Sequence, residues 1–85
     1  MENIELSVVM PCLNEEKGIL LCIEKIKEVF AKEKLTGEII VADNGSTDAS
    51  VQICEKAGAR VFSEPVQGYG AAYLRGLKEA RGKYI

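Results

Sequence analysis

The residues of this chain that could do chemistry gather in three short polar segments, PCLNEE (11–16), DNGSTD (43–48) and EPVQGYG (64–70). Asp43 is the most informative of them, because it directly follows the apolar run of residues 39–42. A carboxylate at the end of a buried strand needs hydrogen-bond donors that replace water. Backbone N–H groups of its own loop could supply them, and so could an N–H group of a ligand such as a nucleobase. The sequence leaves both interpretations open.

The remaining residues of segment 43–48 have simple structural explanations. Asn44 and Gly45 favour a turn with positive φ. Ser46 or Thr47 can cap a helix, and Asp48 suits its first turn. None of them requires a ligand.

The segment 11–16 has a structural and a functional interpretation. Pro11 is expected to end the strand before it, and Asn14 and Glu15 can cap the helix that follows. Alternatively, the loop backbone and the Glu15 carboxylate hold a polar ligand at the N-terminus of that helix, with the carboxylate accepting hydrogen bonds from hydroxyl groups.

The third segment contains two glycines, Gly68 and Gly70, on either side of Tyr69. Glycines let a backbone approach a diphosphate closely, and a helix N-terminus favours anions. The same residues suit a flexible loop followed by close helix packing. The pattern is not G-x-G-x-x-G, because Tyr73 stands in the third glycine position.

The apolar pattern predicts the elements that must position these segments. Buried strands are expected at residues 4–10, 38–42 and 60–63. Helices are expected at residues 15–34, at about 47–57, and from the glycine segment to about residue 80; Gly37 and Gly58 are expected to end the first two. Residues 82–85 (GKYI) are typical of the start of a fourth strand, so we expect the chain to be a fragment of a longer protein.

This alternation of strands and helices predicts an α/β fold, in which a parallel sheet with right-handed crossovers carries helices on its faces. Ligands bind beyond the carboxyl ends of the strands in such sheets. Each polar segment follows a strand, so all three are expected at that one edge.

Composition narrows the classes of function. The chain has 85 residues, a formal net charge of −2 and a sequence pI of about 5.1, which argues against a nucleic-acid-binding module. It has no His, the commonest general base and metal ligand. Its three cysteines include no C-x-x-C pair and are interpreted as reduced residues of a cytoplasmic protein. No apolar run approaches the length needed to span a bilayer.

Taken together, the runs SVVMPCLNEE, EIIVADNGSTDAS, GARVF and GYGAAYLRGLKEARGKYI closely resemble the N-terminal half of inverting glycosyltransferases of family 2. The most similar group transfers a hexose from a nucleotide-sugar to a polyprenyl (dolichyl-type) phosphate. The resemblance implies a Rossmann-like GT-A fold, truncated here at the start of the fourth strand. Residues 1–85 would then be the nucleotide-sugar-binding N-terminal portion of a glycosyltransferase domain.

The resemblance also implies roles for individual residues. Asp43 matches an aspartate that binds the base ring N–H, and the backbone of the P-x-x-N-E motif, with its glutamate, frames the base and ribose. The glycine segment passes near the diphosphate. The implied nucleotide-binding residues are Pro11, Asn14, Glu15, Asp43, Asn44, Ser46, Gly68 and Gly70.

The sequence departs from the family pattern in three ways. Asn44 stands where many members have a second Asp, and Gln67 stands where many have Lys or Arg. The Asp-x-Asp motif that binds a divalent cation, Mg²⁺ or Mn²⁺, would come after residue 85. We therefore expect this portion to recognise a UDP- or GDP-linked sugar but to be inactive alone, with no metal ligand and no catalytic residue of its own.

Other interpretations of the chain remain open. It could be a non-catalytic nucleotide-binding module, or a flavodoxin-like domain that serves only in interaction. Membrane contact is expected only through parts absent here, at the cytoplasmic face of a membrane. An unpaired sheet edge makes self-association of the fragment a further expectation.

Overall fold

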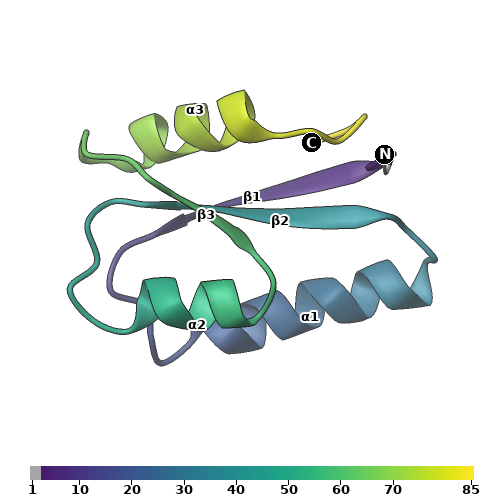
Figure 1. Ribbon diagram of the computed structural model, residues 1–85, viewed down its shortest axis with the longest axis horizontal. Coiled ribbons are helices and arrows are strands. Elements are labelled where there is room, and N and C mark those ends of the chain that lie inside the picture. Colours follow the sequence, from purple (N-terminus) through teal and green to yellow (C-terminus); the bar gives the residue numbers. More distant parts are fainter. Residues whose placement is uncertain (1–2) are drawn as a thin grey trace.

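The computed structural model describes residues 3–85, which form three layers (Figure 1). The middle layer is a parallel sheet of β1 (Leu6–Cys12), β2 (Gly37–Asp43) and β3 (Arg60–Ser63), side by side in that order. Helices α1 (Ile19–Lys32) and α2 (Ser50–Lys56) cover one face, and α3 (Tyr69–Glu79) covers the other. The predicted α/β fold with a parallel sheet and flanking helices is confirmed.

The segment predicted to begin a fourth strand lies beside the start of β1. Tyr84 forms a parallel bridge with Leu6, and its carbonyl accepts a hydrogen bond from the N–H of Ser7 at 2.8 Å. This contact is on the edge of β1 that faces away from β2, because the N–H of Leu6 points the other way, to Thr36. The order across the sheet is therefore residue 84, β1, β2, β3, as in Rossmann-type winding.

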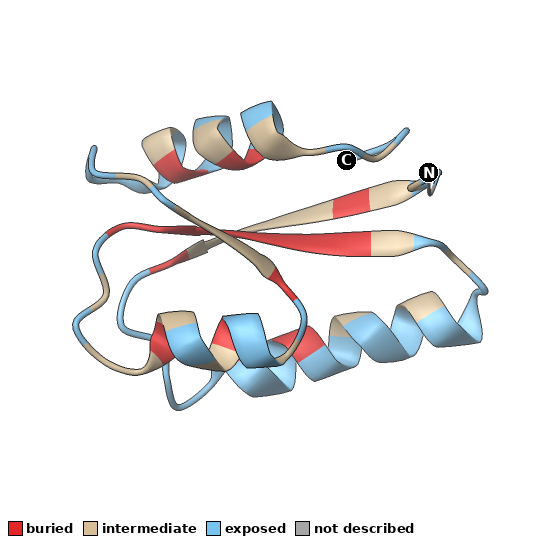
Figure 2. Ribbon diagram, viewed as in Figure 1, coloured by how far each residue is buried: buried red, intermediate tan, exposed pale blue. Residues whose placement is uncertain are grey.

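The core lies on both faces of β2, which is why its sequence is continuously apolar rather than alternating. Figure 2 shows β2 as the most buried strand. Ile39 and Val41 pack with α1 and α2, in one cluster with Ile19, Ile23 and Cys54. Successive side chains alternate in direction along a strand, so Ile40 and Ala42 point to the face that α3 covers.

Helix α3 approaches β1 closely through a glycine. A Cβ atom built at Gly76 would overlap Cγ1 of Val9 in β1. The absence of a side chain at this position therefore sets the distance between α3 and the sheet.

The expectation that Pro11 ends the first strand is wrong, because β1 continues to Cys12 and pairs Pro11 with Ala42. The N–H of Ser7 points to the edge of β1 that faces away from β2, and the N–H groups of residues two apart along a strand point to the same edge. An N–H group at position 11 would therefore face away from β2, so Pro11 costs the sheet no hydrogen bond to β2.

The first helix also begins later than expected, at Ile19 rather than at residue 15, and Gly18 precedes it. Asn14 is not its N-cap. Asn14 has a positive φ of 52°, and its side-chain oxygen accepts hydrogen bonds from the N–H groups of Thr47 and Asp48. The segment before α1 is thus attached to the loop after β2 and cannot join the helix.

The other helix ends shift by a few residues. Helix α1 ends at Lys32, and Gly37 begins β2 rather than closing the helix. Helix α2 begins at Ser50 rather than at residue 47, since Asp48 Oδ1 accepts the Ser50 N–H at 2.9 Å. Neither Ser46 nor Thr47 caps it.

Candidate functional site

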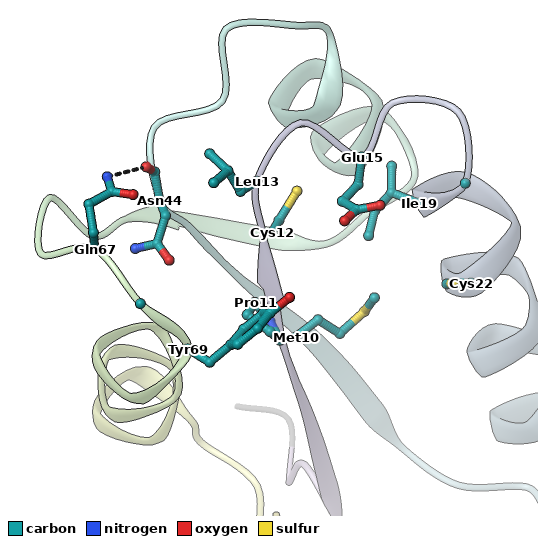
Figure 3. Close-up of a pocket in the computed structure, with 12 residues that line it drawn as sticks. Met10, Pro11, Cys12, Leu13, Glu15, Ile19, Cys22, Asn44, Gln67 and Tyr69 are labelled. Carbon is teal, nitrogen blue, oxygen red and sulfur yellow. Dashed lines mark hydrogen bonds between the residues drawn. The ribbon is translucent and has the colours of Figure 1, made fainter.

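A cavity of about 620 Å³ opens at the carboxyl-terminal edge of the sheet, where the chain leaves β1 (Figure 3). Its walls come from the end of β1, the start of α1 and the segment that leads into α3. Most of the lining is apolar, with a few polar side chains, which is the usual composition of a small-molecule site. The apolar side chains include Met10, Leu13, Ile19 and Tyr69, and the polar ones are Glu15, Asn44 and Gln67.

Four of the eight residues implied by the family resemblance line this cavity: Pro11, Glu15, Asn44 and Gly68. The other four lie next to it but are not part of its wall. Gly70 belongs to the first turn of α3. Asn14, Asp43 and Ser46 belong to the two loops behind the wall.

Asp43 directs its carboxylate at its own loop. Oδ2 accepts hydrogen bonds from the N–H groups of Gly45 (3.0 Å) and Ser46 (2.8 Å), and Oδ1 accepts one from the Ser46 hydroxyl at 2.5 Å. The residue is only 4% exposed. The structure thus shows the first of the two interpretations, in which N–H groups of its own loop donate to Asp43. A contact of Asp43 with a ligand stays a prediction.

Asn44 connects three segments that surround the cavity. Its N–H donates to the Cys12 carbonyl (2.9 Å), and its carbonyl accepts from Gln67 Nε2 (2.8 Å). Its side-chain Nδ2 donates to the carbonyls of Glu64 and Val66, both at 3.0 Å. Figure 3 shows the side-chain oxygen of Asn44 nearer to Pro11 and Tyr69 than its side-chain nitrogen is.

The residue pattern predicted Asn44 as a turn residue and the family resemblance implied that it binds a nucleotide, but neither gave any sign of these contacts. Its partners lie about 20 residues further along the chain. The sequence offers one local signal, the change from the apolar run 39–42 to two successive polar residues, and this signal does not distinguish Asn44 from Asp43.

The loops after β1 and β2 hold each other through side-chain contacts. Asn14 N–H donates to the Ser46 hydroxyl (2.9 Å), and Glu15 N–H donates to the Ser50 hydroxyl (2.8 Å). Asn14 Oδ1 in return accepts the Thr47 N–H at 2.8 Å. Asn14 and Ser46 thereby fix the backbone that carries Glu15.

Glu15 alone, among the described residues that line the cavity, carries a charge at neutral pH. Its side chain points into the cavity in Figure 3. A carboxylate accepts hydrogen bonds, so it suits hydroxyl groups of a ligand rather than an anion. Gln67, where the family resemblance led us to look for a cation, lies at the opposite wall and is bonded to Asn44.

The buried cysteines contribute no nucleophile here. Burial raises the pKa of Cys12, which lines the cavity, above its ordinary value. Burial also raises the pKa of Cys54, beneath it in the core, to about 11. Both thiols are therefore protonated at neutral pH and are free cysteines in the structure, and the reduced state in the cell stays a prediction from the sequence.

Comparison with known families decides what kind of protein this cavity belongs to. Residues 7–85 match the model of glycosyl transferase family 2. The chain belongs to this family. A family 2 glycosyltransferase is an enzyme, so the predicted class of protein and its GT-A fold are confirmed.

Two curated glycosyltransferases illustrate the similarity. The low-salt glycan biosynthesis hexosyltransferase Agl6 of Haloferax volcanii is 48% identical over 80 residues, 94% of this chain and 19% of that protein. The dolichyl-phosphate beta-glucosyltransferase of Saccharomyces cerevisiae is 36% identical over 96 aligned positions, which include 98% of this chain and 28% of that protein. The chain thus spans under a third of the length of either relative.

A solved structure supports the fold independently. Glucosyl-3-phosphoglycerate synthase from Mycobacterium tuberculosis, crystallised with Mn²⁺, UDP and glucosyl-3-phosphoglycerate, superposes with a TM-score of 0.77 at 35% identity. The match covers 96% of this chain and 33% of that one. The common part is therefore nearly all of this chain and about a third of the synthase.

Residues 3–85 of this family 2 chain contain no set of side chains that could bind the Mn²⁺ found in that neighbour. Within that range, no group of three or more Cys, Asp, Glu or His side chains could hold a metal ion. The same range contains no helix long and apolar enough to cross a membrane.

Proposed function

We propose that this chain is the nucleotide-recognition part of an enzyme that transfers a hexose from a nucleotide-diphospho-sugar to an acceptor. One observation carries the proposal. The three polar segments come together at one edge of the sheet and enclose a single cavity of about 620 Å³. A GT-A neighbour crystallised with UDP is similar over 96% of the chain, which supports a nucleotide as the ligand.

Within this cavity we assign the base to the side formed by Asn44 and Pro11. Both hydrogens of the Asn44 amide are donated to backbone carbonyls, so only its oxygen, a hydrogen-bond acceptor, is left for a ligand. The ring N–H of uracil or of guanine could donate a hydrogen bond to this oxygen. Asp43, Ser46 and Asn14 then act by holding the loops, although a direct contact of Asp43 with the base remains the prediction from the family.

We assign the ribose and the diphosphate of the nucleotide to the other sides of the cavity. The Glu15 carboxylate is placed to accept hydrogen bonds from ribose hydroxyl groups. Gly68 and Gly70 lie at the start of α3, where backbone N–H groups favour the diphosphate. A divalent cation would supply charge stabilisation when the diphosphate leaves, with ligands outside residues 3–85. We therefore expect the 85 residues alone to bind a nucleotide without transferring a sugar.

For the acceptor we propose a polyprenyl phosphate, used at the cytoplasmic face of a membrane. The similarity to a dolichyl-phosphate beta-glucosyltransferase favours this class. We also propose that isolated chains self-associate along the open edge of β1, beyond its contact with Tyr84. Light scattering after gel filtration, over a range of concentrations, tests this second point directly.

Calorimetric titration of the chain with UDP, GDP and ADP tests the proposed ligand. We expect UDP or GDP to bind and ADP, which has the same diphosphate, to bind more weakly, because the unsubstituted N1 of adenine is an acceptor. Glu15→Gln should weaken UDP binding, whereas Glu24→Gln on the exposed face of α1 should not. If neither UDP nor GDP binds to the folded chain, the proposal fails.

A further inference from the structure

The segment between β3 and α3 has no buried side chain to hold it. Residues 65–70 are all exposed, including Val66 at 62% and Tyr69 at 74%. Its turn is closed internally, because Glu64 Oε2 accepts the Val66 N–H at 2.9 Å. Burial of apolar surface therefore contributes little to the position of this segment, and hydrogen bonds must supply it.

Apart from the bond from the Ala72 N–H to the Gly68 carbonyl at the start of α3 and the turn closed by Glu64, the hydrogen bonds that attach residues 65–68 to the rest of the described chain all involve Asn44. The Glu64 N–H donates to the Asp43 carbonyl and fixes the start of the segment. Beyond that point, Asn44 Nδ2 donates to the carbonyls of Glu64 and Val66, and Gln67 Nε2 donates to the Asn44 carbonyl. Asn44 itself is 6% exposed and is bonded to the end of β1 through its N–H.

We propose that the Asn44 side-chain amide is the positioning group for residues 64–68, with Gln67 as its second attachment. The segment places Gly68 and Tyr69 on the cavity wall, so Asn44 determines the shape of that wall. The role requires an amide. An aspartate has the same shape but no hydrogen to donate, and its carboxylate would face two carbonyl oxygens at about 3.0 Å.

If the proposed function is right, one amide has two roles at the cavity. The oxygen of Asn44 would bind the base, and its nitrogen would hold the segment 64–68. A base bound to the oxygen would keep the amide in the orientation that the segment needs. Nucleotide binding and ordering of the segment would therefore favour each other.

The test is NMR relaxation of the nucleotide-free protein carrying Asn44→Asp. In the unchanged protein we expect backbone N–H order parameters of about 0.85 for Val66 and Gln67, and a fall below about 0.6 in the variant. Asp43→Asn is the matched control, since it is an isosteric exchange at the neighbouring position. It should loosen Gly45 and Ser46, whose N–H groups donate to the Asp43 carboxylate, and leave Val66 and Gln67 unchanged.

Three outcomes decide the matter. Selective loosening of Val66 and Gln67 by Asn44→Asp supports the proposal, and unchanged order parameters overturn it. If Asn44→Asp does not fold, Asn44→Ala decides, because it removes both side-chain donors without adding a charge: a fall at Val66 and Gln67 supports the role and no fall overturns it. These measurements need no ligand, so a chain that binds neither UDP nor GDP would refute the proposed function and leave this inference standing.

Discussion

Replacing Glu38 by Gln should strongly destabilise the fold. Glu38 is 9% exposed at the start of β2. Its Oε2 accepts hydrogen bonds from the Ser7 hydroxyl (2.6 Å) and the Arg81 N–H (2.7 Å), and its Oε1 accepts one from Arg60 Nη1 (2.6 Å). The Ser7 hydroxyl oxygen accepts the Gly82 N–H at 2.8 Å. One carboxylate thus joins all three strands to the segment after α3.

The magnitude follows from counting acceptors. An amide has one oxygen where the carboxylate has two. If that oxygen faces Arg60, the Arg81 N–H loses its acceptor; if it faces Arg81, the amide hydrogens meet the guanidinium. An unsatisfied buried donor costs about 1–3 kcal/mol, and the remaining bonds lose their charge assistance. We expect a loss of about 2–4 kcal/mol in the free energy of unfolding, or about 8 °C or more in Tm for a domain of this size.

Thermal unfolding followed by circular dichroism, from pH 3 to pH 8, measures the effect. Burial alone would raise the pKa of Glu38, but hydrogen bonds from Ser7, the Arg81 backbone and Arg60 outweigh it and hold the pKa below its ordinary value. A lowered folded-state pKa gives stability that is complete above the unfolded pKa and is lost as the pH falls through the folded one. The difference between the chain and Glu38→Gln should therefore be constant above about pH 5 and shrink below about pH 4.

Glu24→Gln, on an exposed face of α1, is the control and should change the free energy of unfolding by no more than about 0.5 kcal/mol. The reasoning is refuted if the two variants melt together. It is also refuted if the difference caused by Glu38→Gln persists unchanged to pH 3.

Three further predictions concern other positions. Gly76→Ala should cost about 1–2 kcal/mol by forcing α3 away from β1, whereas Gly70→Ala, with open space at its Cβ, should be neutral or stabilise the fold; equal effects in urea unfolding would contradict the packing argument. In a thiol assay one cysteine, Cys22, should react quickly, and Cys54, buried with a pKa of about 11, should react only on unfolding; fast reaction of all three thiols would count against it. Asn14→Ala should cost about 1–2 kcal/mol by removing the acceptor for two backbone N–H groups, while Asn14→Asp keeps an acceptor and should cost less, as chemical denaturation can show.

The fold could be predicted because its signals are local. Apolar runs predicted the three strands to within two residues at each end, and the glycines and polar clusters indicated the edge at which the loops meet. Helix starts were less accurate. Asn14 has the residue type of an N-cap, but its side chain bonds to Thr47, 33 residues away, and a local signal cannot report such a partner. Glu38 was similarly passed over, since its partners Ser7 and Arg60 lie on neighbouring strands.

The neighbours Asp43 and Asn44 show where sequence reasoning about the site stops. They stand at the end of a strand that is buried on both faces, so the apolar pattern does not say which of two successive side chains will face the cavity. Asp43 is the last residue of β2, and its carboxylate turns back on the loop that follows. Asn44 is the first residue outside the strand, and its amide lies between the segment 64–68 and the cavity. A carboxylate attracts attention because it is charged, but three of its loop's own donors already satisfy it. The uncharged residue beside it keeps a free acceptor on the cavity side, and for that reason we assign the recognition of a base N–H to Asn44.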